Sequence, residues 1–333
     1  MIFKRYLMEE QSNSKEKKGF LFYFHIFFVL AILGIIIAVV IKFKNWGISV
    51  DLNEIRAQGE GEYSDTLDTI LPLVTGHKGK KKKNDRLNIV FFGNSAFSDD
   101  RDTDSCIVNM VGKRLDANVY NASISQSFLS TVESEFKPQD NPYDCYSPYW
   151  MVWRTISDDN DFFYFEAADE LKERDVVIPE AEDVLELITT IDMNAMDICV
   201  IMYDASDYLY ARPPYEVDHE TDIHTFFGAM NATLDLLQEN YPNLRIIVSS
   251  PTYAYWYDGT SSDLMYYIAP LSTYAIWEST AAMDHGVSFI DNIYGVFNED
   301  TADEYLKDNL HLNQKGKELI TDRIVEAITY YDK

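Results

Sequence analysis

The sequence predicts an α/β domain in which helices cover both faces of a mainly parallel, five-stranded sheet, with one transmembrane helix before it. Three observations support this prediction. From residue 87 onward, short apolar or β-branched runs alternate with segments of helical length. These segments are long enough for the right-handed crossovers that join parallel strands. Ahead of this region, one long apolar run lies near the N-terminus.

The apolar run occupies residues 19–41 and contains His25 as the one side chain that titrates near neutral pH. At about 1.5 Å per residue, roughly 23 residues cross a hydrocarbon core of ~30 Å. The alternative is a cleaved signal peptide, but its apolar core usually has about 7–15 residues. No Ala-x-Ala cleavage pattern follows the run. We therefore expect an uncleaved anchor that binds the lipid bilayer, with residues 1–18 as a cytoplasmic tail.

Basic residues on the two sides of this run predict its orientation. Five precede it and three follow it, namely Lys4, Arg5, Lys15, Lys17 and Lys18, then Lys42, Lys44 and Arg56. Because the more basic side stays in the cytoplasm, we expect the N-terminus inside and the following domain outside. The lysine run at 78–83 opposes this bias, but it lies beyond the roughly 20 residues over which the rule is strongest.

The chain is strongly acidic, with 28 Lys and Arg residues against 55 Asp and Glu residues. Such a surface repels phosphate backbones, so we do not expect nucleic acid as a partner. The hydrophobic content of 47% is enough for a packed core, so the acidity belongs to a folded domain. Residues 42–86 have little apolar sequence and are interpreted as a stalk. Its lysine run is a solvated linker or, alternatively, a contact with anionic lipid or wall polymer.

Residues 87–333 are expected to form one domain, whose strands and helices follow in order. The predicted strands are 87–92, 118–121, 197–203, 245–250 and 287–291. The predicted helices are 104–115, 181–192, 223–240, 263–284 and 313–331. Because the carboxyl ends of parallel strands meet at one rim, the active site is expected there.

The segment at about 137–180 does not belong to a minimal unit of this kind. It is dense in aromatic and acidic residues. We interpret it as a packed insertion with its own small core. The alternative is a lid or substrate wall, because aromatic faces suit sugar rings or acyl chains.

The three cysteines, Cys106, Cys145 and Cys199, form neither a disulfide framework nor a metal set. Cys199 lies in an apolar strand and is expected to be buried. A Cys106–Cys145 bridge is left open. The sequence has no phosphate-binding glycine loop and no cofactor signature, so we expect neither a cofactor nor a metal.

A nucleophile, a carboxylate and a base occur in the order Ser95, Asp308, His311. A serine hydroxyl becomes reactive when an imidazole takes its proton and a carboxylate orients that imidazole. Asp308 and His311 are three residues apart, so one tight turn can direct both at the same serine. An Asp-x-x-His pair is common by itself, but its place before a closing amphipathic helix is more specific. The pattern suits attack on an ester.

In four segments the chain resembles the SGNH/GDSL hydrolase superfamily, over roughly residues 87–332. The segments are Gly93-Asn94-Ser95, residues 121–127, residues 204–207 and Asp308-Asn309-Leu310-His311. The resemblance implies a flavodoxin-like, three-layer α/β/α fold. It also implies Ser95 as nucleophile, His311 as base and then acid, and Asp308 as the orienting carboxylate.

The departures from the family pattern concern the oxyanion hole. The family draws donors from the serine N–H, a glycine N–H in the second block and an asparagine amide in the third. Here Gln126 stands at the glycine and Ser206 at the asparagine, while Asp204 replaces a further glycine. Losing one such donor typically costs about 10²–10³ in rate. Asp207 is expected to brace the third loop.

Three functions are therefore considered. The first is a membrane-anchored serine esterase acting through an acyl-enzyme on O-acyl, most plausibly O-acetyl, esters of envelope or environmental polysaccharide. The second is an O-acyltransferase of cell-envelope glycans, with a membrane partner protein that supplies acyl groups. The third is a catalytically impaired binding or assembly protein. The complete set of Ser95, Asp308 and His311 favours the first.

Overall fold

The structure is a computed structural model that describes residues 32, 66–71, 86–157, 161–264 and 268–330. The chain divides into two compact units, Met1–Tyr63 and Ser64–Lys333. The expected tail (1–18), the expected membrane span (19–41, apart from Ile32) and most of the expected stalk lie outside the described residues. Within the described ranges, no helix has the length and apolar character needed to cross a membrane.

Five parallel strands form one sheet in the order β2-β1-β3-β4-β5. They are β1 (Asn88–Gly93), β2 (Asn118–Asn121), β3 (Ile198–Met202), β4 (Arg245–Ser249) and β5 (Ser288–Ile290). Each lies where the sequence predicts a strand, so the mainly parallel sheet is confirmed. The strand order is that of the flavodoxin-like, doubly wound sheets.

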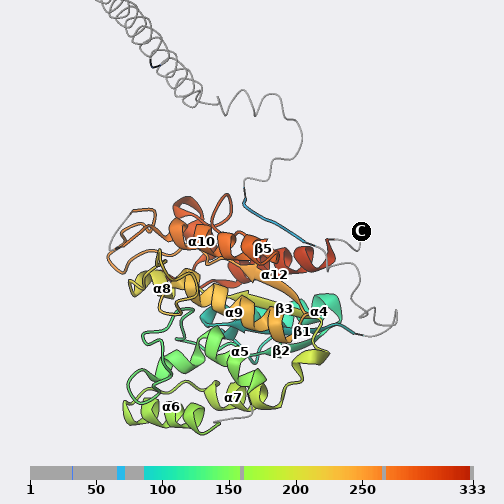
Figure 1. The fold of residues 1–333 in the computed structure, drawn as a ribbon. Helices are drawn as coiled ribbons and strands as arrows, with labels where there is room; N and C mark the ends of the chain where they lie inside the picture. The colour runs from blue at the N-terminus through green and yellow to red at the C-terminus, as the bar shows by residue number, and fades with distance from the viewer. Residues whose placement is uncertain (1–31, 33–65, 72–85, 158–160, 265–267, 331–333) are drawn as a thin grey trace, which may run out of the picture. The chain divides into compact units, whose positions relative to one another are not determined.

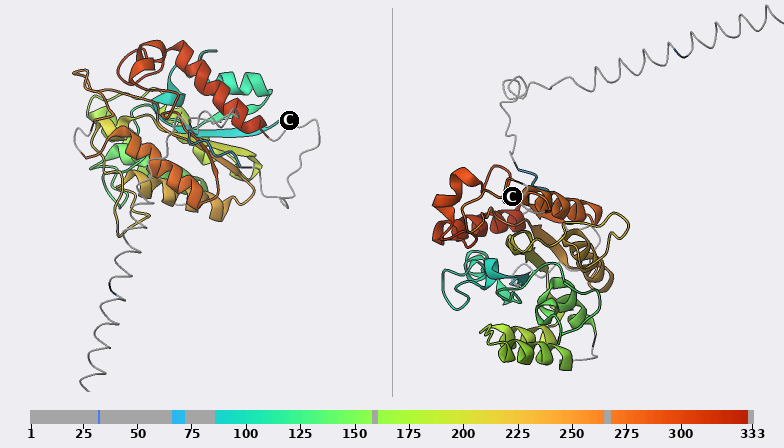
Figure 2. Two further views of the ribbon diagram at one scale, coloured as in Figure 1. Left: turned by 90° about the horizontal axis from the view of Figure 1, so that it is seen from above. Right: turned by 90° about the vertical axis from the view of Figure 1, so that its left-hand side faces the viewer.

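Helices cover both faces of this sheet (Figures 1 and 2). On β1, Ile89 and Phe91 face the apolar layer beneath α4 (Ile107–Leu115) and α12 (Gln314–Thr329). Val90 and Phe92 face the opposite layer. That layer is covered by α5 (Pro148–Ile156), α9 (Phe226–Asn240) and α10 (Leu271–Asp284). Side chains that alternate between two buried layers confirm the predicted three-layer arrangement.

The predicted helix at 263–284 begins only at Leu271, because Pro270 directly precedes its first turn. Several short helices were not predicted from the sequence. They are α3 (Ser95–Ser98), α8 (Ser206–Leu209), η3 (Glu299–Thr301) and α11 (Ala302–Tyr305). Two of them, α3 and α8, begin at the carboxyl end of a strand and therefore lie at the expected site.

The aromatic insertion is helical and shares the core of the domain. It contains η1 (Pro142–Tyr146), α5 and α6 (Asp161–Glu173), and is followed by α7 (Ala181–Thr190) and η2 (Met193–Ala195). Its buried Tyr146 and Val152 belong to the same apolar cluster as Val90 and Phe92 of β1. The prediction of a separate small core is therefore wrong. Because α5 packs on α9, the insertion enlarges the existing core.

The three cysteines are unpaired and buried. Cys106 lies in the layer under α4 and α12, whereas Cys145 lies in the opposite layer. The sheet separates the two thiols, so the Cys106–Cys145 bridge does not form. Cys199 lies inside β3 and is fully buried, as expected.

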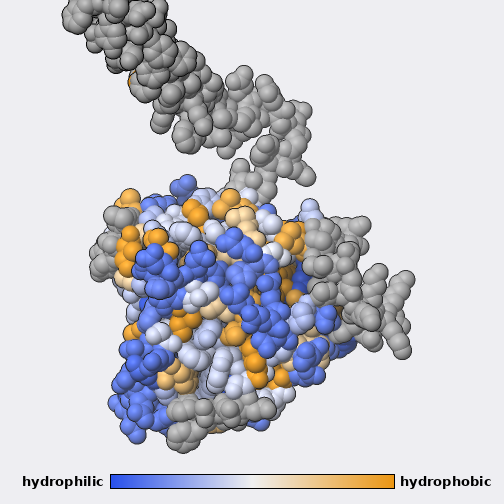
Figure 3. Space-filling view, in the orientation of Figure 1, coloured by the Kyte–Doolittle hydropathy of each residue, from blue (hydrophilic) through white to orange (hydrophobic). Residues whose placement is uncertain are grey.

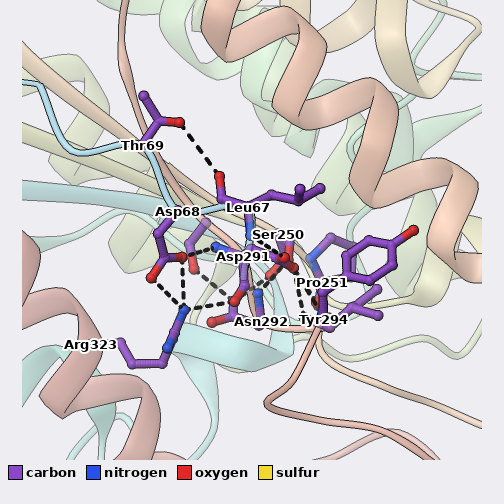
Figure 4. A network of polar contacts seen from close by, with 11 residues as sticks. Leu67, Asp68, Thr69, Ser250, Pro251, Asp291, Asn292, Tyr294 and Arg323 are labelled. Atoms are coloured by element: carbon purple, nitrogen blue, oxygen red, sulfur yellow. Dashed lines mark hydrogen bonds and ion pairs between the residues drawn. The ribbon is translucent and has the colours of Figure 1, made fainter. Parts of the chain in front are cut away.

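Residues 66–71, here called the edge segment, pair with the edge of the sheet. Thr69 and Phe289 of β5 exchange two backbone hydrogen bonds, of 2.9 and 2.8 Å, in an antiparallel bridge. Figure 4 shows the surrounding network, in which Asp68 Oδ1 accepts from the Asp291 N–H (2.7 Å) and from Arg323 Nη2 (2.8 Å). This part of the predicted stalk is therefore not a free linker, because it covers an otherwise open strand edge.

Candidate active site

Ser95 lies on a sharp turn at the carboxyl end of the central strand β1. The strand ends at Gly93, and α3 begins at Ser95 itself. A Cβ atom on Gly93 would lie 2.2 Å from the carbonyl oxygen of Met202 in β3, so this position requires glycine. The close approach of the two strands places Ser95 at the rim, where its side chain is 8% exposed.

Asp308 and His311 lie together in the tight turn that precedes α12. The Asp308 carboxylate oxygens lie 2.9 and 3.0 Å from His311 Nδ1. Oδ1 also accepts the backbone N–H groups of His311 (2.7 Å) and Leu310 (2.9 Å). Burial opposes ionisation of Asp308, but these N–H groups and the His311 ring outweigh it and lower the pKa of the carboxyl. An ionised Asp308 holds the proton on Nδ1, which leaves Nε2 as the basic nitrogen.

Ser95 and His311 line one small pocket. The other side chains around it include Asp99, Asp204, Thr252 and Lys317. Among the hydrogen bonds of the described residues, none joins Ser95 Oγ to His311 Nε2. Such catalytic bonds are often long before substrate binds. The structure thus brings the three predicted catalytic residues together, with Asp308 supporting His311 from behind.

Gln126 adopts the backbone conformation that glycine normally provides. Its φ angle is 63°, in the left-handed region. The turn around it is closed by the Ser127 hydroxyl, which donates to the Ile124 carbonyl oxygen (2.7 Å). Asn94 Nδ2 donates to the Ser127 carbonyl oxygen (3.1 Å), so this turn is held against the residue before the nucleophile. The turn therefore forms with glutamine at the position where the resemblance predicts glycine.

Ser206 does not present a donor to the pocket. Its hydroxyl donates to Asp204 Oδ1 (2.5 Å), and its backbone N–H donates to the same oxygen (2.9 Å). The hydroxyl hydrogen is thereby used within the loop after β3. Ser206 lies beside the site as a partner of Asp204, and it does not replace the amide of an asparagine.

Asp207 is fully buried and is not among the side chains that line the pocket. Its carboxylate accepts the backbone N–H groups of Leu129 (2.8 Å) and Ser130 (3.0 Å), and also the Ser130 hydroxyl. Burial raises the pKa of Asp207, while Ser130 and Arg212 favour its ionised form. Asp207 therefore ties the loop after β2 to the loop after β3.

Asn94 and Asp204 form a reciprocal pair that the sequence analysis did not identify. Asn94 Nδ2 donates to Asp204 Oδ1 (2.7 Å), and the Asp204 N–H donates to Asn94 Oδ1 (2.9 Å). Both residues are buried. The sequence signal for this pair was two departures from the SGNH/GDSL blocks that the chain resembles. Asn94 stands where the first block has an aspartate, and Asp204 stands where the third block has a glycine. Relative to that pattern, the carboxyl group lies in the loop after β3 and not in the loop after β1.

A buried cation also lies at the pocket. Lys317 of α12 has a side chain that is 3% exposed, and its Nζ lies 2.6 Å from Asp100 Oδ2. The hydrogen bond and charge of Lys317 lower the pKa of Asp100. Sequence periodicity did not distinguish Lys317 from the other lysines of this helix.

Comparison with known proteins gave no matching family model and no matching curated sequence. Solved structures similar to this chain include a protein from Lactobacillus plantarum, with 16% identity, a TM-score of 0.49 and coverage of 74% of this chain and 98% of that one. A possible lipase from Chitinophaga pinensis has 11% identity, a TM-score of 0.48 and coverage of 74% and 98%. A carbohydrate acetylesterase from Sinorhizobium meliloti has 11% identity, a TM-score of 0.44 and coverage of 74% and 99%. At these identities the likeness concerns the fold, and the function must be argued from the residues of the site.

Proposed function

We propose that this chain is a serine ester hydrolase of the SGNH type that works through an acyl-enzyme. The observation that carries the proposal is the Asp308–His311 pair in the pocket of Ser95. His311 Nε2 takes the proton of Ser95 Oγ as that oxygen bonds to the acyl carbon. The carbonyl electron pair moves onto its oxygen, then returns as the alcohol leaves with the proton from His311. Water repeats the sequence and frees the serine.

The developing oxyanion needs donors near Ser95. The backbone N–H groups of Ser95 and Gln126 suit this role, because the loops of both are joined through Asn94. In the part of the chain that the structure describes, neither N–H group donates to a protein acceptor. Both are therefore available to a substrate oxygen.

The proposed substrate class is a small O-acyl ester, most plausibly O-acetyl, on an envelope or environmental polysaccharide. The small size of the pocket beside Ser95 supports a short acyl group. The polysaccharide part of the proposal rests on the expected anchor at residues 19–41, which would place the domain outside the cell with the N-terminus inside.

The acyltransferase alternative has less support. A lid that excludes water would favour transfer, and the aromatic insertion was the candidate for it. Within the described residues, however, no side chain from 137–180 lines the pocket. Hydrolysis remains the simpler reaction for a site that water can enter.

The test uses the full chain in detergent micelles, with p-nitrophenyl acetate hydrolysis and fluorophosphonate labelling as readouts. We expect Ser95→Ala to abolish labelling and His311→Ala to lower the hydrolysis rate by about 10³-fold or more.

Two matched controls accompany these variants. Ser98→Ala removes another serine of α3, and His224→Ala removes the histidine of another Asp–His pair, in which Nδ1 lies 2.9 Å from Asp222 Oδ1. Both should leave the rate unchanged. A folded wild type that neither hydrolyses the ester nor takes the label would refute the proposal, and so would labelling that persists without Ser95.

A further inference from the structure

The carboxyl group of Asp204 uses its two oxygens very differently. Oδ1 accepts three hydrogen bonds, from Asn94 Nδ2 (2.7 Å), the Ser206 N–H (2.9 Å) and the Ser206 hydroxyl (2.5 Å). Oδ2 is buried and has no hydrogen-bond partner among the described residues. Leaving a carboxylate oxygen buried without a donor is costly, whereas a protonated oxygen needs only an acceptor.

Asp204 lines the pocket in which the third donor is missing. It lines the same pocket as Ser95 and His311, and the charge of His311 acts on its carboxyl. The asparagine expected two residues later is replaced by Ser206, whose hydroxyl is already bound to Asp204. Asp204 therefore brings to the pocket wall a buried carboxyl oxygen that has no hydrogen-bond partner among the described residues.

Burial of Asp204 acts in favour of its protonated form. Burial raises the pKa of this carboxyl, while the bonds from Ser206 and Asn94 and the charge of His311 partly oppose the rise. The other charged side chains around the pocket are Asp99, which lies 3.1 Å from Lys307 Nζ, and Lys317, which is paired with Asp100. Both are engaged with opposite charges of their own.

We infer that Asp204 supplies the third oxyanion donor of the proposed hydrolase, through a hydrogen bond from Oδ2–H to the acyl oxygen. The inference rests on the proposed function. As the Ser95 oxygen bonds to the acyl carbon, its proton moves to His311 and the carbonyl electron pair moves onto the acyl oxygen. The Asp204 proton stays on Oδ2 throughout. An ionised Asp204 would instead repel the oxyanion, so the reaction slows as the pH rises through the pKa of Asp204.

The decisive variant is Asp204→Asn, because its amide keeps an acceptor oxygen for Asn94 and Ser206 and places a permanent donor at the Oδ2 position. The measurement is kcat/KM for p-nitrophenyl acetate from pH 5 to 9 on the full chain, with the rate of Ser95→Ala subtracted. We expect kcat/KM of the wild type to fall toward high pH. For Asp204→Asn, we expect kcat/KM to stay at its maximum over the same range. Asp204→Ala should lower the plateau by about 10²-fold.

Asp284→Asn is the control for loss of an acidic charge, since Asp284 is exposed at the end of α10. It should reproduce the wild-type profile. Two results overturn the inference while the hydrolase stands. One is an Asp204→Asn variant, folded by circular dichroism, that is as slow as Asp204→Ala. The other is a fall of kcat/KM at high pH that occurs equally in the wild type and in Asp204→Asn. A wild type without Ser95-dependent activity would overturn the proposed function, and the inference with it.

Discussion

Buried polar residues of this domain show how one position constrains another at the scale of single residues. The Asn94 amide serves Asp204 and Ser127 together, because its nitrogen donates to the Asp204 carboxyl and to the Ser127 carbonyl oxygen while its oxygen accepts the Asp204 N–H. An ionised aspartate at position 94 would lose the amide donor to Asp204 Oδ1 and would place a second carboxyl group against Asp204 in a buried site, where the two could not both ionise without repulsion. The two departures from the family pattern are therefore best understood as one change.

Glu278 of α10 gives a prediction at the same scale. It is fully buried, and neither carboxylate oxygen has a hydrogen-bond partner among the described residues. Burial, and then the charge of Asp207, raise the pKa of Glu278 well above its usual value. A carboxyl with a raised folded-state pKa contributes stability that is present below its unfolded pKa and is lost as the pH rises.

We therefore expect Glu278→Gln to raise the melting temperature at pH 8. An increase of about 2–4 °C corresponds to ~1 kcal/mol in a domain of roughly 150–250 residues. The gain should shrink at pH 5, and differential scanning calorimetry at both pH values would measure it. Glu239→Gln, at an exposed position of α9, is the control. A gain of equal size at both pH values would show that the charge of Glu278 is not its cause.

At the scale of elements, the catalytic turn is shaped by the helix that follows it. The Asn313 side chain accepts the Gly316 N–H (3.1 Å) and so begins α12. A Cβ atom on Gly316 would lie 2.5 Å from the carbonyl oxygen of Tyr305. Leu306 and Leu312 close the turn in an antiparallel bridge. The residues after His311 therefore matter because they fix where the turn ends.

The turn at Gln126 gives the prediction for this scale. Non-glycine residues in sparsely populated backbone regions typically cost about 1–3 kcal/mol, part of which glycine relieves. We expect Gln126→Gly to keep hydrolysis within about threefold of the wild type, because the donor N–H stays in place. Gln126→Pro removes that N–H and also cannot adopt a φ of 63°, because the proline ring fixes φ at about −65°, so it should cost about 10²–10³-fold or more. Steady-state kinetics beside circular dichroism would check both variants. Equal activity of the proline variant would exclude the Gln126 N–H as an oxyanion donor.

At the scale of the whole molecule, surface charge and a covered sheet edge are the main features. Figure 3 shows one face of the described domain, on which hydrophilic side chains surround scattered apolar ones. This pattern agrees with a net charge of −27 on a chain that still has a packed core. The edge segment joins β5 to α12 through Asp68 and Arg323, which lie 255 positions apart.

Asp68→Ala should destabilise the domain by about 1–3 kcal/mol, because it leaves the Asp291 N–H without its acceptor and Arg323 without its carboxylate partner. Chemical denaturation would measure the loss. Asp322→Ala is the control, since it breaks the more exposed pair with Arg114, and surface pairs contribute about 0–1 kcal/mol. Hydrolysis should change little, because no residue of the edge segment lines the pocket. Equal stability of the two variants would show that the edge segment adds nothing to the fold.

Sequence patterns alone predicted the positions of the five strands, which the structure confirms, and the candidate catalytic set of Ser95, Asp308 and His311. Both predictions follow from local patterns. The alternation of buried and exposed positions on a strand or helix repeats every few residues, so it can be recognised in the sequence. Asp308 and His311 are three residues apart and lie in one turn. How the loops meet becomes visible only in the folded domain. The pairing of Asn94 with Asp204 and the bridge from Thr69 to β5 join residues that are far apart in the chain. Such contacts depend on how the strands are ordered in the sheet, and no local pattern records that order.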